Sequence, residues 1–247
     1  MPLYQSDAFV LRTYKLGETD QIVVFFTRAY GKLRAVARRS HSPRRSLAGY
    51  CQPLTLLHTI LFGRPSQNLF RINTIDLVQP FRVIHEDFGH LRSGLYLTEL
   101  IDVATREHEP MPELFELMHW SLEQLPQTDQ PAMLLRLFEV CLLMAMGYTP
   151  QLMYCARCMR DLPLQDGEFS PPLGGLICSS CAPAMRQTLK VSRVALEVLH
   201  HLINNGVDGW SDQHFEAEVE QEIEALLHAH LTARLGRELK SYAFLHL

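Results

Sequence analysis

The residues best suited to chemistry are four cysteines in two Cys-x-x-Cys pairs, Cys155 with Cys158 and Cys178 with Cys181. Nineteen residues separate the pairs, a spacing typical of sites in which four thiolates hold one zinc ion. Each pair can form a tight turn that directs two sulfurs to the same ion at about 2.3 Å. Four thiolates complete the tetrahedral shell and leave no position for an activated water, so the spacing predicts a structural Zn²⁺ and not a catalytic one.

Redox-active disulfides and an iron–sulfur cluster are the alternatives to zinc at these cysteines. Redox Cys-x-x-Cys motifs usually follow a strand at the start of a helix in an α/β pattern, which this sequence lacks. The Gly174-Gly175 pair between the motifs is typical of a hairpin and favours zinc. Cys51 and Cys141 stand among apolar residues, as buried thiols do, so we expect a protein of a reducing, cytoplasmic compartment.

Basic residues form the second candidate site, because the charges are segregated along the chain. The formal net charge is −4, yet no Asp or Glu occurs between Asp20 and Asp76, where the Lys and Arg residues give +9. A solubilising surface normally mixes both signs, so this stretch favours a polyanionic ligand over a merely solvated face. We predict salt-sensitive, sequence-independent DNA contacts at Lys32, Arg34, Arg38, Arg39, Arg44 and Arg45.

Aromatic residues are interleaved with these basic residues and could stack on unpaired bases. We expect most of them in the protein core and one or two as exposed stacking platforms. The candidates are Tyr14, Phe25, Phe26, Tyr30, Phe62 and Phe70.

Short runs rich in β-branched and aromatic residues must position the basic site. The predicted strands are 8–14, 21–27, 33–37, 54–61 and 69–78, with a polar loop at 40–46. Five strands in this length predict a small β-barrel of the OB type, although an SH3-like barrel has the same pattern.

Beyond Pro80 the apolar period changes from two to 3.6, which predicts a helical region. The predicted helices are 84–104, one from near 112 to 122, 131–146, 191–202 and one after 211. Proline and glycine interrupt the pattern between the cysteines. We therefore predict an α+β protein: an OB-fold domain at 1–80, an α-helical domain at 81–150 and 186–247, and an inserted four-cysteine zinc-binding segment at 151–185.

Several activities lack their motifs in this sequence. No G-x-x-x-x-G-K-[ST], H-E-x-x-H or G-x-S-x-G pattern is present, and no apolar run is long enough to span a membrane. We therefore expect a protein that is not an enzyme and works through affinity. An RNA-binding or ribosome-associated barrel with a zinc ribbon, and a metal-dependent nuclease, are the alternatives.

Short runs along nearly the whole chain resemble the RecO family of bacterial recombination mediators. They are Ala8-Phe9-Val10-Leu11, Gly17-Glu18-Thr19-Asp20, Gly94-Leu95-Tyr96-Leu97-Thr98-Glu99-Leu100, Arg136-Leu137-Phe138-Glu139, Met146-Gly147-Tyr148, the four cysteines, and Gly236-Arg237-Glu238-Leu239-Lys240-Ser241. The resemblance implies an OB-fold, a helical domain and a zinc-binding insertion. It further implies DNA repair by binding of single- and double-stranded DNA, annealing of strands and loading of RecA. The implied partners are RecR and the C-terminal tail of single-stranded-DNA-binding protein.

Overall fold

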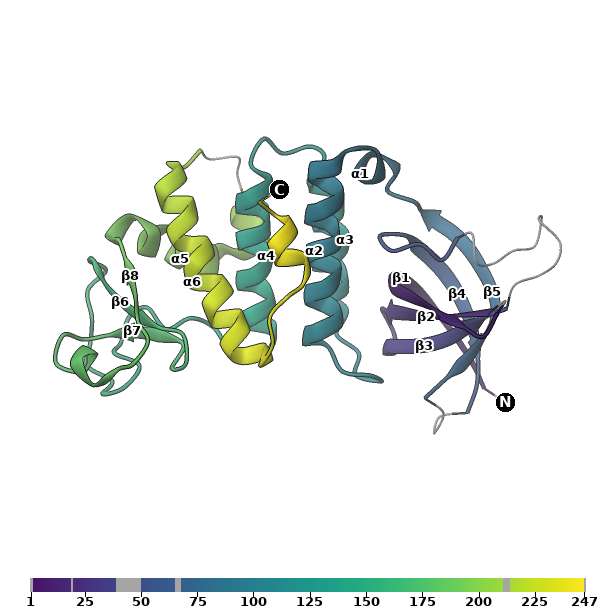
Figure 1. The fold of residues 1–247 in the computed structure, drawn as a ribbon, viewed down its shortest axis with the longest axis horizontal. Coiled ribbons are helices and arrows are strands. Elements are labelled where there is room, and N and C mark those ends of the chain that lie inside the picture. The colour runs from purple at the N-terminus through teal and green to yellow at the C-terminus, as the bar shows by residue number, and fades with distance from the viewer. Residues whose placement is uncertain (1, 19, 39–49, 65–67, 211–213, 247) are drawn as a thin grey trace. The chain divides into compact units, whose positions relative to one another are not determined.

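The computed structural model describes residues 2–18, 20–38, 50–64, 68–210 and 214–246 (Figure 1). These residues form two compact units, the first from Met1–Pro126 with Leu239–Leu247 and the second from the residues between. The chain therefore leaves the first unit after Pro126 and returns to it after Glu238. The domain limits predicted from the sequence follow element type and not contacts, and they stay a prediction.

Five strands close a barrel in the first unit, which confirms the OB-type prediction. The strands are β1 (Leu3–Leu16), β2 (Asp20–Thr27), β3 (Gly31–Ala37), β4 (Leu56–Phe62) and β5 (Phe70–Gln79). Their order is β1-β2-β3-β5-β4, and β1 pairs with both β2 and β4. The short parallel contact between β3 and β5 closes the barrel.

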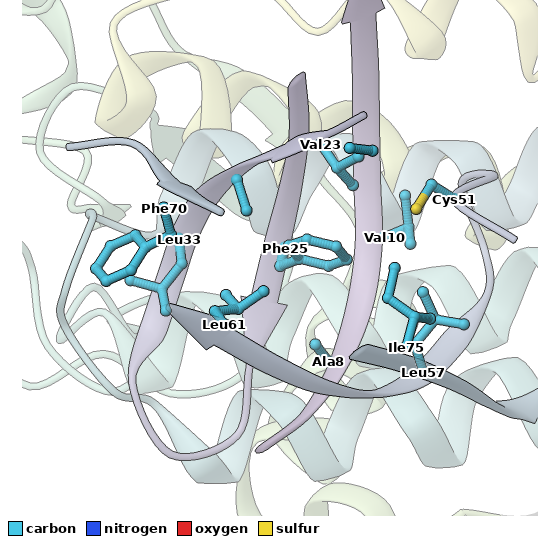
Figure 2. Packing of buried hydrophobic residues seen from close by; sticks show 12 residues of the cluster. Ala8, Val10, Val23, Phe25, Leu33, Cys51, Leu57, Leu61, Phe70 and Ile75 are labelled. Atoms are coloured by element: carbon cyan, nitrogen blue, oxygen red, sulfur yellow. The ribbon is translucent and has the colours of Figure 1, made fainter. Parts of the chain in front are cut away.

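Alternate side chains of β1, β2 and β3 fill much of the barrel interior, because successive side chains point to opposite faces (Figure 2). Residues of β4 and β5 and Cys51, which precedes β4, complete it. The interior residues are Ala8, Val10, Val23, Phe25, Leu33, Ala35, Ala37, Cys51, Leu57, Leu61, Phe70 and Ile75. Burial raises the pKa of the Cys51 thiol to about 12. Cys51 is thus a buried neutral thiol, as its apolar neighbours in the sequence predict.

Three helices follow the barrel in the first unit: α1 (Arg82–Glu86), α2 (Phe88–Ala104) and α3 (Pro112–Gln124). The prediction of one unbroken helix over 84–104 is wrong. Asp87 has extended backbone angles, φ −111° and ψ 127°, and its carboxylate accepts a hydrogen bond from the His90 N–H at 2.7 Å. This N-cap starts α2 anew and ends α1.

The end of the chain returns to α2 of the first unit. The Glu99 carboxylate accepts hydrogen bonds from the backbone N–H groups of Lys240 at 3.1 Å and Ser241 at 2.7 Å, and from the Ser241 hydroxyl. Leu239 is buried, and the short 3₁₀ turn η5 (Ser241–Phe244) follows it. One carboxylate therefore fixes the C-terminal segment on α2.

The second unit contains three helices that pack on one another and a small three-stranded sheet. The helices are α4 (Pro131–Ala145), α5 (Arg193–Asn205) and α6 (Ala217–Leu235). The strands are β6 (Gly167–Ser170), β7 (Gly175–Ile177) and β8 (Leu189–Val191), in the order β7-β6-β8. Two further 3₁₀ turns are η3 (Ala182–Ala184) and η4 (Gly206–Gly209). Among the described helices, none is long and apolar enough to cross a membrane.

Candidate metal centre and nucleic-acid face

The sulfurs of Cys155, Cys158, Cys178 and Cys181 converge, each within 4.8 Å of the others. The Cys158 and Cys178 Sγ atoms are 3.8 Å apart. A tetrahedron whose corners lie about 2.3 Å from a central zinc ion has edges of about 3.8 Å. The four side chains therefore could hold one metal ion, in agreement with their spacing in the sequence.

Two turns and one hairpin bring the cysteines together. In the first turn the Cys155 N–H donates to the Arg160 carbonyl at 2.8 Å, and in the second the Cys181 N–H donates to the Cys178 carbonyl at 2.9 Å. The β6–β7 hairpin between them pairs Ser170 with Gly175. A side chain at Gly175 would meet the Gln151 Cβ at 2.7 Å, so this close approach requires glycine.

Backbone N–H groups prepare the cysteines for a cation. Burial opposes ionisation of the Cys155 thiol, but hydrogen bonds from the backbone of Cys178, Cys158 and Arg157 lower its pKa to about 6. Cys181 has the opposite bias, because its contact with Cys178 raises its pKa to about 12. The thiolate is the form that binds metal, so the backbone hydrogen bonds that lower the pKa of Cys155 favour metal binding there.

The outer face of β1, β2 and β3 carries exposed basic and aromatic side chains. Val23 points into the barrel, so its neighbours Val24 and Ile22 point away from the barrel interior. Val24 is nevertheless fully buried and Ile22 half-buried, so only side chains around them reach solvent. The strand register places Arg12 and Arg34 on either side of Val24, and Tyr14 beside Ile22. A β-bulge between Val10 and Arg12 re-aims β1, so that Arg12 and Tyr14 share this outer face.

Tyr14 is the exposed aromatic of this face. Its side chain is 37% exposed, and the Arg12 guanidinium carbon lies 5.7 Å from its ring centroid. Phe25, Phe26 and Phe70 are instead fully buried in the first unit. This agrees with the expectation that most of the aromatic residues belong to the core.

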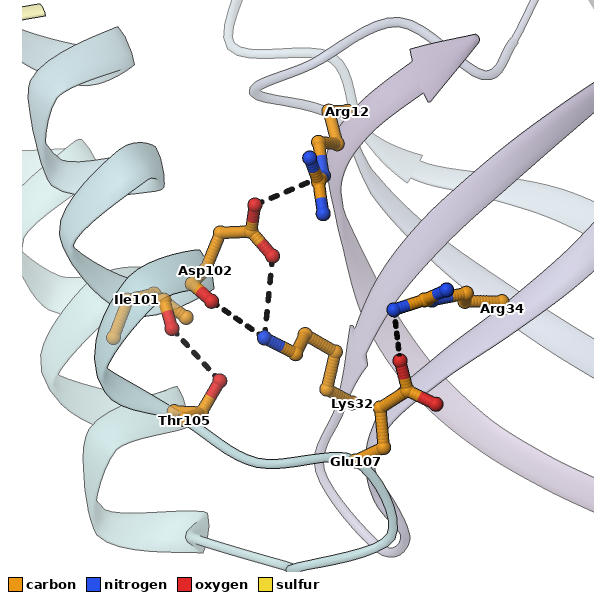
Figure 3. Close-up of polar contacts among 7 residues, drawn as sticks. All are labelled: Arg12, Lys32, Arg34, Ile101, Asp102, Thr105 and Glu107. Atoms are coloured by element: carbon orange, nitrogen blue, oxygen red, sulfur yellow. Dashed lines mark hydrogen bonds and ion pairs between the residues drawn. The ribbon is translucent and has the colours of Figure 1, made fainter. Parts of the chain in front are cut away.

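Lys32 is buried and its charge is neutralised inside the first unit (Figure 3). Its Nζ lies 3.2 Å from the Asp102 carboxylate on α2 and also donates to the Asp102 carbonyl. The two side chains are only 10% and 13% exposed. The geometry gives Lys32 a role in joining β3 to α2, and a DNA contact at Lys32 stays a prediction that this burial disfavours.

Arg12 and Arg34 also reach carboxylates but remain accessible. Arg12 Nε lies 2.9 Å from the second oxygen of Asp102, and Arg34 pairs with Glu107 (Figure 3). Their side chains are 53% and 42% exposed. Their carboxylate partners are less accessible, at 13% for Asp102 and 25% for Glu107. A guanidinium group carries five N–H donors, so a phosphate can bind donors that the carboxylate does not engage.

The remaining predicted DNA contacts follow β3. Arg38 is exposed immediately after the strand. Arg39, Arg44 and Arg45 lie outside the described residues. Sequence reasoning did not include Arg12 among the contacts, because β1 lies outside the carboxylate-free stretch. Two-residue alternation along β1 could have indicated Arg12 and Tyr14 together, had the bulge been recognised.

Comparisons with known proteins agree with these features. The family model "Recombination protein O N terminal" matches residues 1–81, and "Recombination protein O C terminal" matches residues 85–243. The chain is 32% identical to "DNA repair protein RecO" of Symbiobacterium thermophilum, over 99% of this chain and 97% of that protein. It is 32% identical to the protein of the same name from Anaeromyxobacter sp., over 96% and 93%, and 30% identical to that of Myxococcus xanthus, over 99% and 98%.

Proposed function

From the membership of this chain in the RecO family of DNA repair proteins, we propose that it is a recombination mediator that binds single- and double-stranded DNA, anneals complementary strands and performs no covalent chemistry. Family membership gives the role in DNA repair and recombination. The observation that carries the proposed binding is the outer barrel face, where Arg12, Tyr14 and Arg34 are exposed together.

Guanidinium groups on this face would neutralise phosphates, and the Tyr14 ring would stack on a base. Arg38 extends the basic surface beyond the end of β3. Phosphate contacts carry no sequence information, so the binding would be sequence-independent. It would also weaken steeply with salt, because each contacted phosphate releases counterions.

Fluorescence anisotropy with labelled oligonucleotides tests the proposed DNA binding. Tyr14→Ala should weaken single-strand binding by about 1–3 kcal/mol, the usual contribution of one stacked base, and affect duplex binding less. Joint replacement of Arg38, Arg39, Arg44 and Arg45 by Gln should flatten the dependence of log affinity on log salt. Unchanged binding by this variant would contradict the proposal, and tighter binding of a matched RNA strand would favour an RNA-binding role.

The proposed absence of enzymatic activity has its own test. Labelled DNA incubated with the protein and Mg²⁺ or Mn²⁺ should remain intact, and ATP should not be hydrolysed. A cleavage activity that co-purifies with the protein and is lost when its acidic residues are substituted would overturn this part of the proposal.

RecR, the C-terminal tail of single-stranded-DNA-binding protein and RecA are the proposed partners, RecA through its loading onto coated strands. Family membership supports these assignments. Annealing of strands coated with single-stranded-DNA-binding protein, with and without its C-terminal tail, tests the contact with that tail. RecA filament formation on the same coated strands tests the loading of RecA.

The proposed metal is one structural Zn²⁺ bound by the four cysteines. It is supported by the all-thiolate donor set and by the sulfur separations. Purified protein should contain one zinc per chain by elemental mass spectrometry, and Cys158→Ala should lose it. Cys141→Ala is the matched control, since Cys141 is a half-buried thiol outside the cluster.

A further inference from the structure

The hairpin around the first cysteine pair is a closed turn with a packed inner side. The Leu162 N–H donates to the Met153 carbonyl at 2.9 Å, and Tyr154 pairs with Asp161 across the hairpin. On the inner side, Leu162 packs against the buried cluster that includes Cys155. The hairpin between Met153 and Leu162 is therefore held at its ends, at its core and at the metal site.

The outer side of this hairpin is unusually apolar for a surface. Met153 and Tyr154 are each 42% exposed, and Met159 is 66% exposed. Met159 also has a φ of 59°, in the left-handed region that glycine adopts freely and methionine adopts with strain. Strained backbone and exposed large apolar side chains are both features of ligand-binding surfaces.

Two arginines on the same hairpin add positive charge. Arg157 and Arg160 are exposed, and neither forms an ion pair with a carboxylate of the described residues. Asp161, next to Arg160, is exposed on the same hairpin, whereas two other nearby acids are hydrogen-bonded: Asp166 accepts from the Arg193 N–H at 2.8 Å, and Glu168 accepts from the Thr188 hydroxyl at 2.7 Å. The two guanidinium groups are thus available to an anionic ligand.

The hairpin is locally basic within an acidic unit. Residues 153–162 hold Arg157 and Arg160 against one acid, Asp161, whereas the whole unit of residues 127–238 carries a formal charge of −6. A local excess of arginine on an exposed turn favours an anionic ligand such as a phosphodiester strand.

We propose that the hairpin between Met153 and Leu162 is a second nucleic-acid contact, which binds a single strand independently of the barrel face. Arg157 and Arg160 would bind phosphates, because a guanidinium matches phosphate geometry with two parallel hydrogen bonds. Tyr154 would stack on a base. The inference rests on the proposed function and extends it, since annealing needs two strands bound to the protein at once.

Cross-linking tests the contact directly. The full-length, zinc-loaded protein is irradiated with oligonucleotides that contain 5-bromodeoxyuridine, and the attached peptides are mapped by mass spectrometry. The expected result is a cross-link within the Met153–Leu162 hairpin in addition to the barrel. A cross-link confined to the barrel overturns the inference and leaves the proposed function intact. The opposite result, a cross-link in the hairpin and unchanged binding by the barrel variants, would support the hairpin contact and show that the barrel contact alone fails.

Variants test whether the contact takes a second strand. Two non-complementary oligonucleotides carry a donor and an acceptor dye, and energy transfer reports their joint binding to one chain. Arg157→Gln with Arg160→Gln should bind the first strand within about twofold of the parent and lose about tenfold in affinity for the second. Tyr154→Ala should lose at least about fivefold there.

The matched control is Arg237→Gln, which removes an exposed arginine of the same unit outside the cysteine segment. Zinc content is measured for every variant, so that loss of the metal is not mistaken for loss of a contact. Equal joint binding by the hairpin variants and Arg237→Gln overturns the inference.

Discussion

Replacing Asp102 by Ala should destabilise the first unit, because it leaves the Lys32 ammonium buried without its carboxylate. The two side chains are 10% and 13% exposed, and removing one partner of a buried ion pair costs about 3–5 kcal/mol. Two features reduce that cost. Lys32 keeps the Asp102 carbonyl as an acceptor, and the Arg12 partner of Asp102 is 53% exposed and can turn to water. We therefore expect a loss of about 2–3 kcal/mol.

Urea and thermal unfolding, followed by circular dichroism and by a probe placed in the barrel, measure this loss. For a chain of this size, 2–3 kcal/mol corresponds to a fall of about 4–12 °C in the midpoint of the affected transition. Lys32→Met combined with Asp102→Leu should recover much of the loss, since an apolar pair of similar volume replaces the charges without an unpaired group.

A loss below about 0.5 kcal/mol in Asp102→Ala would refute the reasoning, because it is the value of an exposed ion pair. DNA affinity provides a second test of the role assigned to Lys32. Lys32→Met should leave single-strand binding nearly unchanged once the protein is folded, whereas Arg38→Gln should weaken it. A larger effect at Lys32 than at Arg38 would return Lys32 to the set of DNA contacts.

Three further predictions concern other contacts. Gly31→Ala should destabilise the first unit by more than about 1 kcal/mol in urea unfolding, because Gly31 has a φ of +69° and a Cβ there would collide with the backbone of Glu109. Glu99→Ala should release the C-terminal segment and speed its proteolytic removal, while Glu99→Gln should be intermediate; equal cleavage of all three proteins would contradict this. Burial, assisted by nearby Arg234, lowers the pKa of His230 despite its two carbonyl contacts, so the folded protein binds fewer protons than the unfolded chain. The free energy of unfolding should therefore be fully retained above about pH 6.5 and fall as the pH drops below it, with a shallower fall in His230→Gln.

Features that depend on neighbours in the sequence were predictable from the sequence. The cysteine spacing alone indicated the cluster, since each Cys-x-x-Cys turn is local and two turns suffice to gather four sulfurs. Alternation of apolar residues indicated the five barrel strands, and Pro112 and Pro131 marked the starts of α3 and α4. The break at Asp87 was also local but was missed, because the apolar period continues across it while the side chain caps a new helix.

The tertiary structure alone decided what the basic residues do. A count of charges along the chain treats Lys32 and Arg38 alike, but the fold places Lys32 against Asp102, 70 residues away, and leaves Arg38 exposed. The separate runs around Glu99 and Lys240-Ser241 likewise proved to be two halves of one hydrogen-bonded contact. The physical reason is that composition and period determine local structure and total charge. The availability of a charge to a ligand depends on burial and on partners that only the folded chain brings within a few ångströms.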